Sequence, residues 1–149
     1  MDALKISNDV FSQILATIGN CPPECGGVLG AGNDGIITDF YFDVTGKSTP
    51  TGYSPDVTAI NDMLSNDWMP RGILMVGIVH SHANGNNVPS CGDIGYGVRI
   101  LQALDTVECF YLPIITTNNG QVCMDCYVIC PDEQHDYVCK KIGWDIVVR

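Results

Sequence analysis

The spacing of apolar residues predicts three helices. Across residues 6–18 apolar side chains recur at helical spacing, and Ser7 stands where an N-cap is expected. A second helix is expected to open at Ser54-Pro55, because proline is tolerated in the first turn of a helix. A third helix is expected to begin at Ser90 and to run to about Leu104.

Apolar runs between these helices predict strands. Residues 25–31 are apolar and glycine-rich, and Asn33-Asp34-Gly35 predicts a hairpin turn into a second strand over residues 36–44. Residues 45–53 are expected to form a loop. The run GILMVGIVH at residues 72–80 is typical of a strand that is buried on both faces.

The last third of the chain predicts another hairpin and an ambiguous tail. Residues 109–116 and 122–130 are expected to be strands, and Asn118-Asn119-Gly120 is a turn signal between them. After residue 130 the pattern favours a helix to about Lys141, followed by a short strand over residues 145–148.

These elements predict a mixed α/β fold in which helices flank a central, largely antiparallel sheet. A chain of 149 residues can bury one sizeable core, so we expect a single domain that covers residues 1–149. The hydrophobic fraction of 46% with only 16% charged residues excludes a disordered chain.

The net charge restricts the class of partner. Seven Lys and Arg residues against 17 Asp and Glu residues give a formal charge of −10. Binding to nucleic-acid phosphates or to an anionic membrane surface needs clustered Lys and Arg, so neither partner is expected.

The sequence contains no signal for a membrane or for export. The longest apolar run, residues 72–79, is far too short to span a bilayer, and the first residues show no signal peptide. The protein is therefore expected to be cytoplasmic. In that compartment its eight cysteines are better read as reduced thiols than as a disulfide framework, although an even number could pair.

Two of the three histidines lie two residues apart at the end of the buried strand. His80 and His82 would point to the same side, because strand side chains alternate. A helix that begins near Ser90 would present Asp93 in its first turn, facing back towards them. Two imidazoles, one carboxylate and an open fourth position describe a catalytic zinc site.

Each of these residues also has a simpler interpretation. His80 could end a strand with its ring partly solvated, and Ser90 with Asp93 fits the S-x-x-[DE] capping pattern of a helix. Glu24 follows two prolines and could be a solvated loop carboxylate. Taken together, the fixed spacing His-x-His-x7-Ser-x2-Asp is improbable by chance, which favours the metal site.

The pattern His80-Ser81-His82, then Ser90 and Asp93, resembles the signature of the JAMM metalloproteases, the catalytic branch of the MPN (Mov34) superfamily. Upstream, Glu24-Cys25-Gly26-Gly27-Val28-Leu29-Gly30 is similar to the segment that carries the general base of this family. The order of predicted elements also agrees, so the resemblance covers most of the chain.

This resemblance implies a role for each matching residue. His80, His82 and Asp93 would bind Zn²⁺. Glu24 would hold the reacting water and accept its proton, and Ser90 would donate a hydrogen bond to the oxyanion of the tetrahedral intermediate.

Two departures qualify the resemblance. Position 83 is Ala, where many relatives have Pro after the second histidine, but this change removes no ligand. A related branch, the RadC-like proteins, usually has Asn where this chain has Ser81 and lacks the Glu24-type segment, so the JAMM assignment is favoured. The chain is similar in length to the minimal prokaryotic members, which act on small ubiquitin-like carriers.

Three other signals carry less weight. Gly46-Lys47-Ser48-Thr49 lacks the upstream glycine of a phosphate-binding loop. The thiols of Cys123, Cys126 and Cys130 are better read as small apolar side chains than as metal ligands. Cys91, at a helix start, is a weak candidate for a nucleophile.

The leading hypothesis is a zinc metallopeptidase or isopeptidase that cleaves an amide bond at the C-terminal tail of a ubiquitin-like or sulfur-carrier protein. The alternative from another class is a non-catalytic MPN-type scaffold. A RadC-like nucleic-acid factor is a third hypothesis, and the acidic charge disfavours it.

Overall fold

The computed structural model describes residues 3–148. Its first half contains, in order, β1 (Ala3–Ser7), α1 (Asn8–Thr17), a 3₁₀ turn (Ile18–Asn20), β2 (Gly26–Ala31), β3 (Ile37–Phe42), β4 (Lys47–Thr49), β5 (Gly52–Ser54) and α2 (Val57–Met63). Its second half contains a π turn (Leu64–Trp68), a 3₁₀ turn (Met69–Arg71), β6 (Leu74–Ser81), α3 (Cys91–Ala103), β7 (Phe110–Tyr111), β8 (Ile114–Asn118), β9 (Gln121–Asp132) and β10 (Asp136–Val147).

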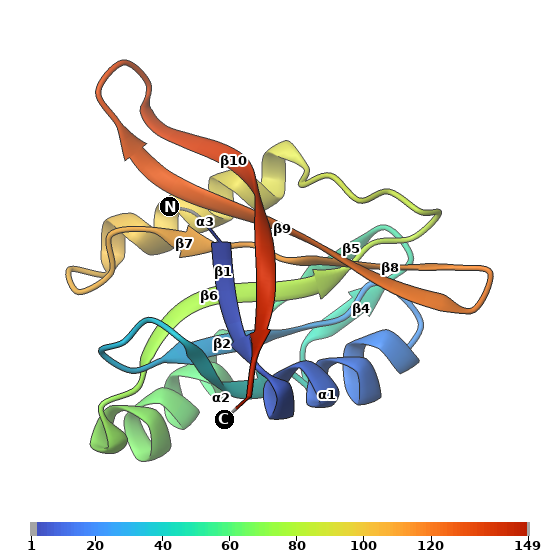
Figure 1. Cartoon of the computed structure of the whole chain (residues 1–149), viewed down its shortest axis with the longest axis horizontal. Helices are drawn as coiled ribbons and strands as arrows, with labels where there is room; N and C mark the ends of the chain where they lie inside the picture. The colour runs from blue at the N-terminus through green and yellow to red at the C-terminus, as the bar shows by residue number, and fades with distance from the viewer. Residues whose placement is uncertain (1–2, 149) are drawn as a thin grey trace.

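Eight strands form one mixed sheet, in the order β10-β1-β3-β2-β6-β7-β9-β8. The neighbours of β2 are antiparallel to it, whereas β1 runs parallel to both β10 and β3. Because β10 also pairs with β9, the sheet curls round and partly closes on itself. The predicted mixed α/β fold is confirmed, and β1, near the start of the chain, lies beside and parallel to β10, near its end (Figure 1).

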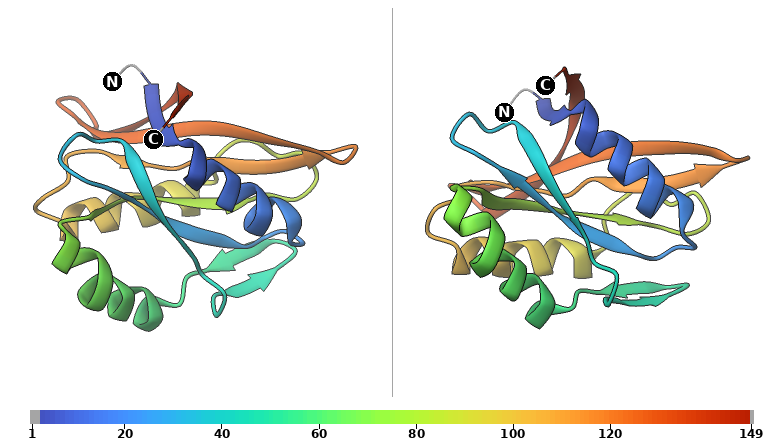
Figure 2. Two further views of the ribbon diagram at one scale, coloured as in Figure 1. Left: turned by 60° about the horizontal axis from the view of Figure 1, so that its bottom comes forward. Right: turned by 90° about the horizontal axis from the view of Figure 1, so that it is seen from below.

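Helices lie on both sides of the sheet (Figure 2). Helix α1 lies on one side, where Val10 and Ile14 enter a core that includes Leu4 and Ile6 of β1. Helices α2 and α3 lie on the other side, together with the small β4–β5 hairpin. On that side Leu101 of α3 packs in a second cluster of buried apolar residues.

Strand β6 lies in the middle of the sheet and carries the long apolar run. Every residue from Val76 to Ser81 is buried, as the sequence predicts for a strand covered on both faces. In the register of β2 with β6, Gly26 stands directly opposite His80. Strands β2 and β6, near the centre of the sheet, therefore bring Gly26 beside the first of the two histidines.

Helix boundaries follow capping chemistry. The Ser7 hydroxyl accepts a hydrogen bond from the Val10 amide at 3.1 Å, as predicted for the N-cap of α1. The N-cap of α2 is Asp56 rather than the expected Ser54, because the Asp56 carboxylate accepts from the Ala59 amide. The turns that follow α2 end at Gly72, whose φ of 72° is left-handed.

Four further sequence-based predictions are wrong. Ile6 belongs to β1, since alternate burial with Leu4 replaces the helical pattern there. The expected loop at residues 45–53 contains the β4–β5 hairpin, and the strand at 109–116 is broken into β7 and β8. The expected helix after residue 130 is the second arm of the β9–β10 hairpin, because that segment pairs with β9 and with β1.

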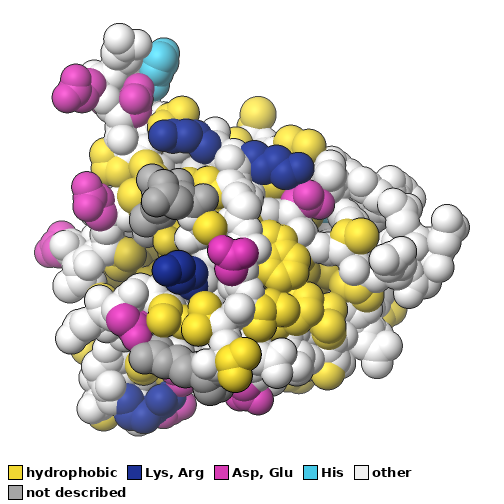
Figure 3. Space-filling model, in the orientation of Figure 1, with side chains coloured by type: hydrophobic (Ala, Val, Ile, Leu, Met, Phe, Trp, Pro, Cys, Tyr) yellow, Lys and Arg dark blue, Asp and Glu magenta, His cyan; other side chains and the backbone are white. Residues whose placement is uncertain are grey.

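The surface around β1 and β10 is mixed in character. Figure 3 shows that Lys and Arg side chains on this face are separated by acidic and apolar side chains and do not gather into one basic patch. Within residues 3–148, no helix is both long and apolar enough to cross a membrane.

Candidate metal centre

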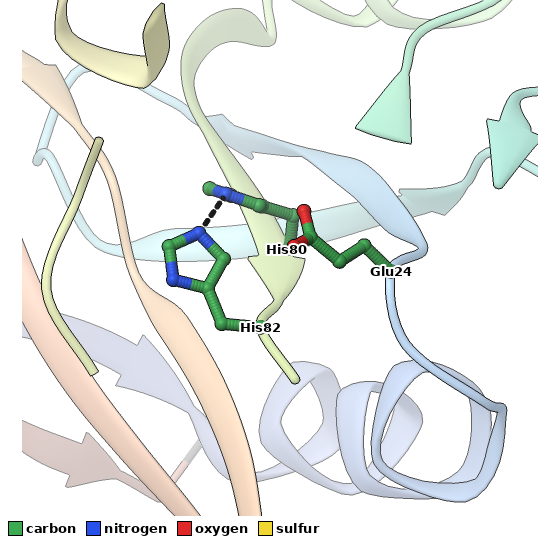
Figure 4. Close-up of side chains that lie close together, drawn as sticks. All are labelled: Glu24, His80 and His82. Carbon is green, nitrogen blue, oxygen red and sulfur yellow. Dashed lines mark hydrogen bonds between the residues drawn. The ribbon is translucent and has the colours of Figure 1, made fainter. Parts of the chain in front are cut away.

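His80 is the penultimate residue of β6 and His82 directly follows the strand, with the two rings close together. Their Nε2 atoms are 2.9 Å apart, and the ring centroids are separated by 4.7 Å (Figure 4). Both side chains are buried, with 4% and 6% of their surface exposed. The i, i+2 spacing on a strand thus brings two imidazoles together, as expected from the alternation of side chains.

Asp93 approaches the histidines from the first turn of α3. One carboxylate oxygen, Oδ1, lies 3.3 Å from His80 Nε2, and the other, Oδ2, lies 3.1 Å from His82 Nε2. The helix start fixes this carboxylate. Asp93 Oδ2 accepts a hydrogen bond from the Ser90 amide at 2.8 Å, and Ser90 Oγ accepts one from the Asp93 amide at 3.0 Å.

The proton on His82 is assigned by its hydrogen bonds. Nδ1 lies 3.0 Å from the carbonyl oxygen of Asn86, which can only accept, so Nδ1 carries a proton. In neutral His82 the lone pair is then on Nε2, directed at the Asp93 carboxylate. Two groups with lone pairs facing each other at this distance require a proton or a cation between them.

The electrostatics of the cluster favour a cation. Burial would raise the pKa of Asp93, but the contacts with His80 and His82 and the Ser90 amide outweigh it, so this pKa lies well below its ordinary value. The Asp93 carboxylate in turn raises the pKa of His82, against the effect of burial. Asp93 is therefore ionised at neutral pH and can bind a cation.

Glu24, two residues before the start of β2, reaches the same place. Its carboxylate and the ring nitrogens of His80 and His82 lie within 4.8 Å of one another, which makes these three residues a group that could hold a metal ion. Figure 4 shows the Glu24 carboxylate beside His80. The Glu24 backbone is fixed by the β4–β5 hairpin, because its amide donates to Thr49 at 3.0 Å and its carbonyl accepts from the Ser48 hydroxyl.

A cavity of about 380 Å³ opens onto the cluster. Its polar wall contains Glu24, His80, His82, Ser90 and Asp93. Apolar and aromatic side chains also line it, namely Ile78, Tyr53, Tyr96, Phe110 and Leu112. An apolar pocket with a few convergent polar groups is the usual form of a ligand or active site.

The donor set fits a zinc ion. With zinc–ligand distances of roughly 2.0–2.1 Å, adjacent ligand atoms on a tetrahedral ion lie about 3.3 Å apart. The three contacts that join His80 Nε2, His82 Nε2 and the Asp93 carboxylate measure 2.9, 3.3 and 3.1 Å. Imidazole nitrogen and carboxylate oxygen are also the ligands that zinc takes in catalytic sites.

A mixed sheet with a His-x-His pair at the end of its central strand, and an Asp in the first turn of the next helix, defines an α/β domain of the MPN type. The sequence matches the family described as prokaryotic homologs of the JAB domain over residues 7–127. The chain therefore belongs to this family, and the resemblance drawn from the sequence is confirmed.

Solved structures agree on the fold. The chain is similar to the solution structure of protein DSY2949 from Desulfitobacterium hafniense, with a TM-score of 0.65 and 20% identity over 98% of this chain and 94% of that one. It is also similar to AF2198, a JAB1/MPN domain protein from Archaeoglobus fulgidus, with a TM-score of 0.52 and 17% identity over 99% and 100% of the two chains. A search of curated proteins found no match.

The structure brings together all five residues singled out in the sequence. Glu24, His80, His82, Ser90 and Asp93 line one cavity. The capping pattern and the ligand pattern, treated above as alternatives, coexist in Asp93.

Sequence reasoning missed the residues that support this group. Asn86 and Asp43 were not identified, and the contact of Tyr53 with His80 was not expected, since no motif links these residues to the histidines along the chain. All eight cysteines are described and free. Of the three that might have formed a second metal site, Cys126 is buried whereas Cys123 is exposed, so only part of that set fills the core.

Proposed function

We propose that the chain is a zinc-dependent metallopeptidase or isopeptidase. The observation that carries this proposal is the triangle of ligand atoms from His80, His82 and Asp93, with a further carboxylate, Glu24, close by. A structural zinc site is normally closed by four protein ligands, whereas three ligands and an open cavity are typical of catalysis.

In this proposal His80, His82 and Asp93 hold the zinc ion, and Glu24 is the base. Asp93 is the better third ligand, because both of its oxygens lie at ligand-to-ligand distance from the imidazoles. When bound, zinc supplies a Lewis acid that polarises the scissile carbonyl and makes water more acidic.

Glu24 transfers the proton of the attacking water in this proposal. As a general base it accepts a proton from the attacking water and then delivers that proton to the leaving amine. The hydrogen bonds that fix the Glu24 backbone to Ser48 and Thr49 support this role, since a base must be held within reach of the water.

Ser90 stabilises the developing oxyanion. Its Oγ accepts from the Asp93 amide, and among residues 3–148 no hydrogen bond uses the hydroxyl proton. That proton is free to be donated to the carbonyl oxygen as negative charge develops there, which typically accelerates acyl transfer by ~10²–10³-fold.

The substrate class is the C-terminal tail of a ubiquitin-like or sulfur-carrier protein. Such a tail is extended and narrow. The cavity is bordered by β5, which within the described residues pairs with β4 alone, so an extended tail could add to it as a further strand. Eight free thiols suit a reducing, cytoplasmic setting.

Glu24→Gln tests the proposed reaction. We expect zinc-loaded wild type to cleave fusions of small carrier proteins, and Glu24→Gln to lose at least ~10²-fold in rate, because amide replaces the base. Zinc content should not change, since Glu24 is not a ligand in this proposal.

Other outcomes favour different conclusions. If Glu24→Gln loses zinc, Glu24 is a ligand and the assignment of Asp93 and Glu24 must be exchanged. If no carrier fusion is cleaved and Glu24→Gln changes nothing, the scaffold function is supported instead.

A further inference from the structure

We propose that Tyr53, held in place by Asp43, positions the His80 ring within the metal centre. This inference rests on the zinc site of the proposed function. Tyr53 and Asp43 lie outside the predicted ligand set, and in this inference they orient one of the metal ligands, His80.

The two histidines are held in different ways. Metal-binding histidines usually donate their second ring nitrogen to a fixed acceptor, which sets the orientation of the ring. His82 does so, because its Nδ1 donates to the Asn86 carbonyl. The Nδ1 of His80 is buried and has no hydrogen-bond partner within residues 3–148. The His80 ring has polar contacts only at Nε2 among the described residues, so the side that carries Nδ1 is held by packing.

Tyr53 supplies that packing. Its ring is stacked on the His80 ring, with the centroids 6.3 Å apart and the planes inclined by 24°. The space for Tyr53 is created by Gly26, which is the cross-strand neighbour of His80. A Cβ atom at Gly26 would lie 2.5 Å from the Tyr53 ring, so the tyrosine occupies the position that a side chain on β2 would otherwise fill.

Asp43 fixes the far end of Tyr53. The Tyr53 hydroxyl donates to Asp43 Oδ2 at 2.7 Å, and the Asp56 amide donates to the same oxygen at 2.9 Å. Asp43 is buried with 3% of its surface exposed, and its own amide donates to Gly26 at 3.0 Å. Asp43 is thus attached to β2, opposite His80, through its backbone amide and to the start of α2 through its carboxylate.

The tyrosine remains a donor under working conditions. Burial and the hydrogen bond to Asp43 raise the pKa of Tyr53 far above its ordinary value. The ring and the hydroxyl therefore have separate tasks. The ring stacks on His80, and the hydroxyl fixes the ring through its hydrogen bond to Asp43.

Zinc affinity measures this positioning directly. Zinc would be titrated into metal-free protein against a chromophoric chelator, and the absorption spectrum of the Co²⁺-loaded protein would report ligand geometry. For Tyr53→Leu we expect a 10–100-fold loss of zinc affinity and an altered cobalt spectrum, as for the loss of other outer contacts to ligands. Tyr53→Phe keeps the ring and should lose less than tenfold.

A double-mutant cycle separates positioning from general destabilisation. Tyr53→Phe and Asp43→Ala both remove the same hydrogen bond, so the double variant should bind zinc no more weakly than Asp43→Ala alone. Tyr41→Leu is the matched control, because Tyr41 packs against the buried cluster that contains Val28, Ile60 and Trp68. It should keep the wild-type affinity.

Two results would overturn the inference. One is wild-type zinc affinity and an unchanged cobalt spectrum in both Tyr53→Leu and Asp43→Ala. The other is an equal loss in Tyr41→Leu. If Tyr53→Leu does not fold, Asp43→Ala and Tyr53→Phe decide the question on the same criteria.

These outcomes are independent of catalysis. A protein that binds zinc through His80 but cleaves no carrier fusion would refute the peptidase proposal and leave the role of Tyr53 intact. Failure of the positioning inference would instead appear as unchanged zinc affinity in the Tyr53 and Asp43 variants, with the peptidase proposal still standing.

Discussion

Asp93 combines two tasks in one carboxylate. Its Oδ2 atom completes the capping box of α3 with Ser90 and also faces His82 Nε2. A helix start is a favourable place for an anionic side chain, because the unpaired amides of the first turn carry partial positive charge. The cap therefore orients the proposed ligand at no cost to the helix.

Ser90 also serves both the helix and the proposed reaction, and the two contributions can be separated. We expect Ser90→Ala to destabilise the fold by ~1 kcal/mol through loss of the cap. It should also slow cleavage of a carrier fusion by ~10²–10³-fold through loss of the oxyanion donor. Urea unfolding and steady-state kinetics measure the two effects.

Ser7→Ala is the control for this pair of effects. Ser7 caps α1 in the same way, with its hydroxyl 3.1 Å from the Val10 amide, but α1 lies on the opposite side of the sheet from α3. It should lose a similar stability and keep the wild-type rate. Equal loss of activity in the two variants would show that Ser90 acts only as a cap.

Among the secondary-structure elements, the β4–β5 hairpin contributes more to the site than its size suggests. It holds the backbone of Glu24 through Ser48 and Thr49, and it carries Tyr53 to the face of His80. A loop in its place would leave the proposed base without these contacts.

Elements whose signal is local could be predicted from the sequence. Strand β6 is marked by a continuous apolar run, and α3 by Ser90 and Asp93 at capping distance. The same is true of the site, since His80, His82 and Asp93 lie within one strand, one loop and one helix turn.

Elements that depend on distant partners could not be predicted. Strand β10 is stabilised by pairing with β9 and with β1 at the other end of the chain, and its own sequence has only a weak alternation. Likewise, Asp43 and Tyr53 acquire their importance only through contacts across the fold.

Close packing of β6 against β7 gives a prediction for the central strand. Gly77 lies opposite Tyr111, and a Cβ added at Gly77 would be 2.5 Å from the Tyr111 carbonyl oxygen. Because that contact is with backbone, Gly77→Ala should destabilise the fold by about 1–3 kcal/mol in urea unfolding. Gly143→Ala in β10, where a Cβ meets nothing within 4 Å, should be close to neutral. Equal losses of stability in the two variants would mean that the close packing at Gly77 does not determine the effect.

Considered as a whole, the molecule is acidic and has two buried thiols, those of Cys25 and Cys126. Burial raises the pKa of the Cys126 thiol from 9.0 to about 12, with a smaller contribution from Asp125. Between these two values the unfolded chain has lost the thiol proton while the folded chain keeps it. The folded state therefore loses stability as the pH rises through this range.

The dependence of the unfolding free energy on pH above pH 9 tests the burial of the Cys126 thiol. From pH 9 towards pH 12 the free energy of unfolding should fall by about 1.4 kcal/mol per pH unit for this thiol alone. Below pH 9 the contribution is constant. In urea unfolding curves recorded across this pH range, Cys126→Ala should reduce the fall in the free energy of unfolding. An unchanged fall would show that Cys126 is not responsible.

The zinc content of the purified protein decides whether the cluster at the end of β6 is a metal centre. Wild-type protein prepared with sufficient zinc and dialysed against metal-free buffer should retain one zinc ion per chain by elemental mass spectrometry. The variant His80→Ala/His82→Ala should retain none, because it lacks both imidazoles of the proposed ligand set. Less than about half an equivalent in the wild type, unchanged in the double variant, would refute the metal centre and with it the proposed peptidase.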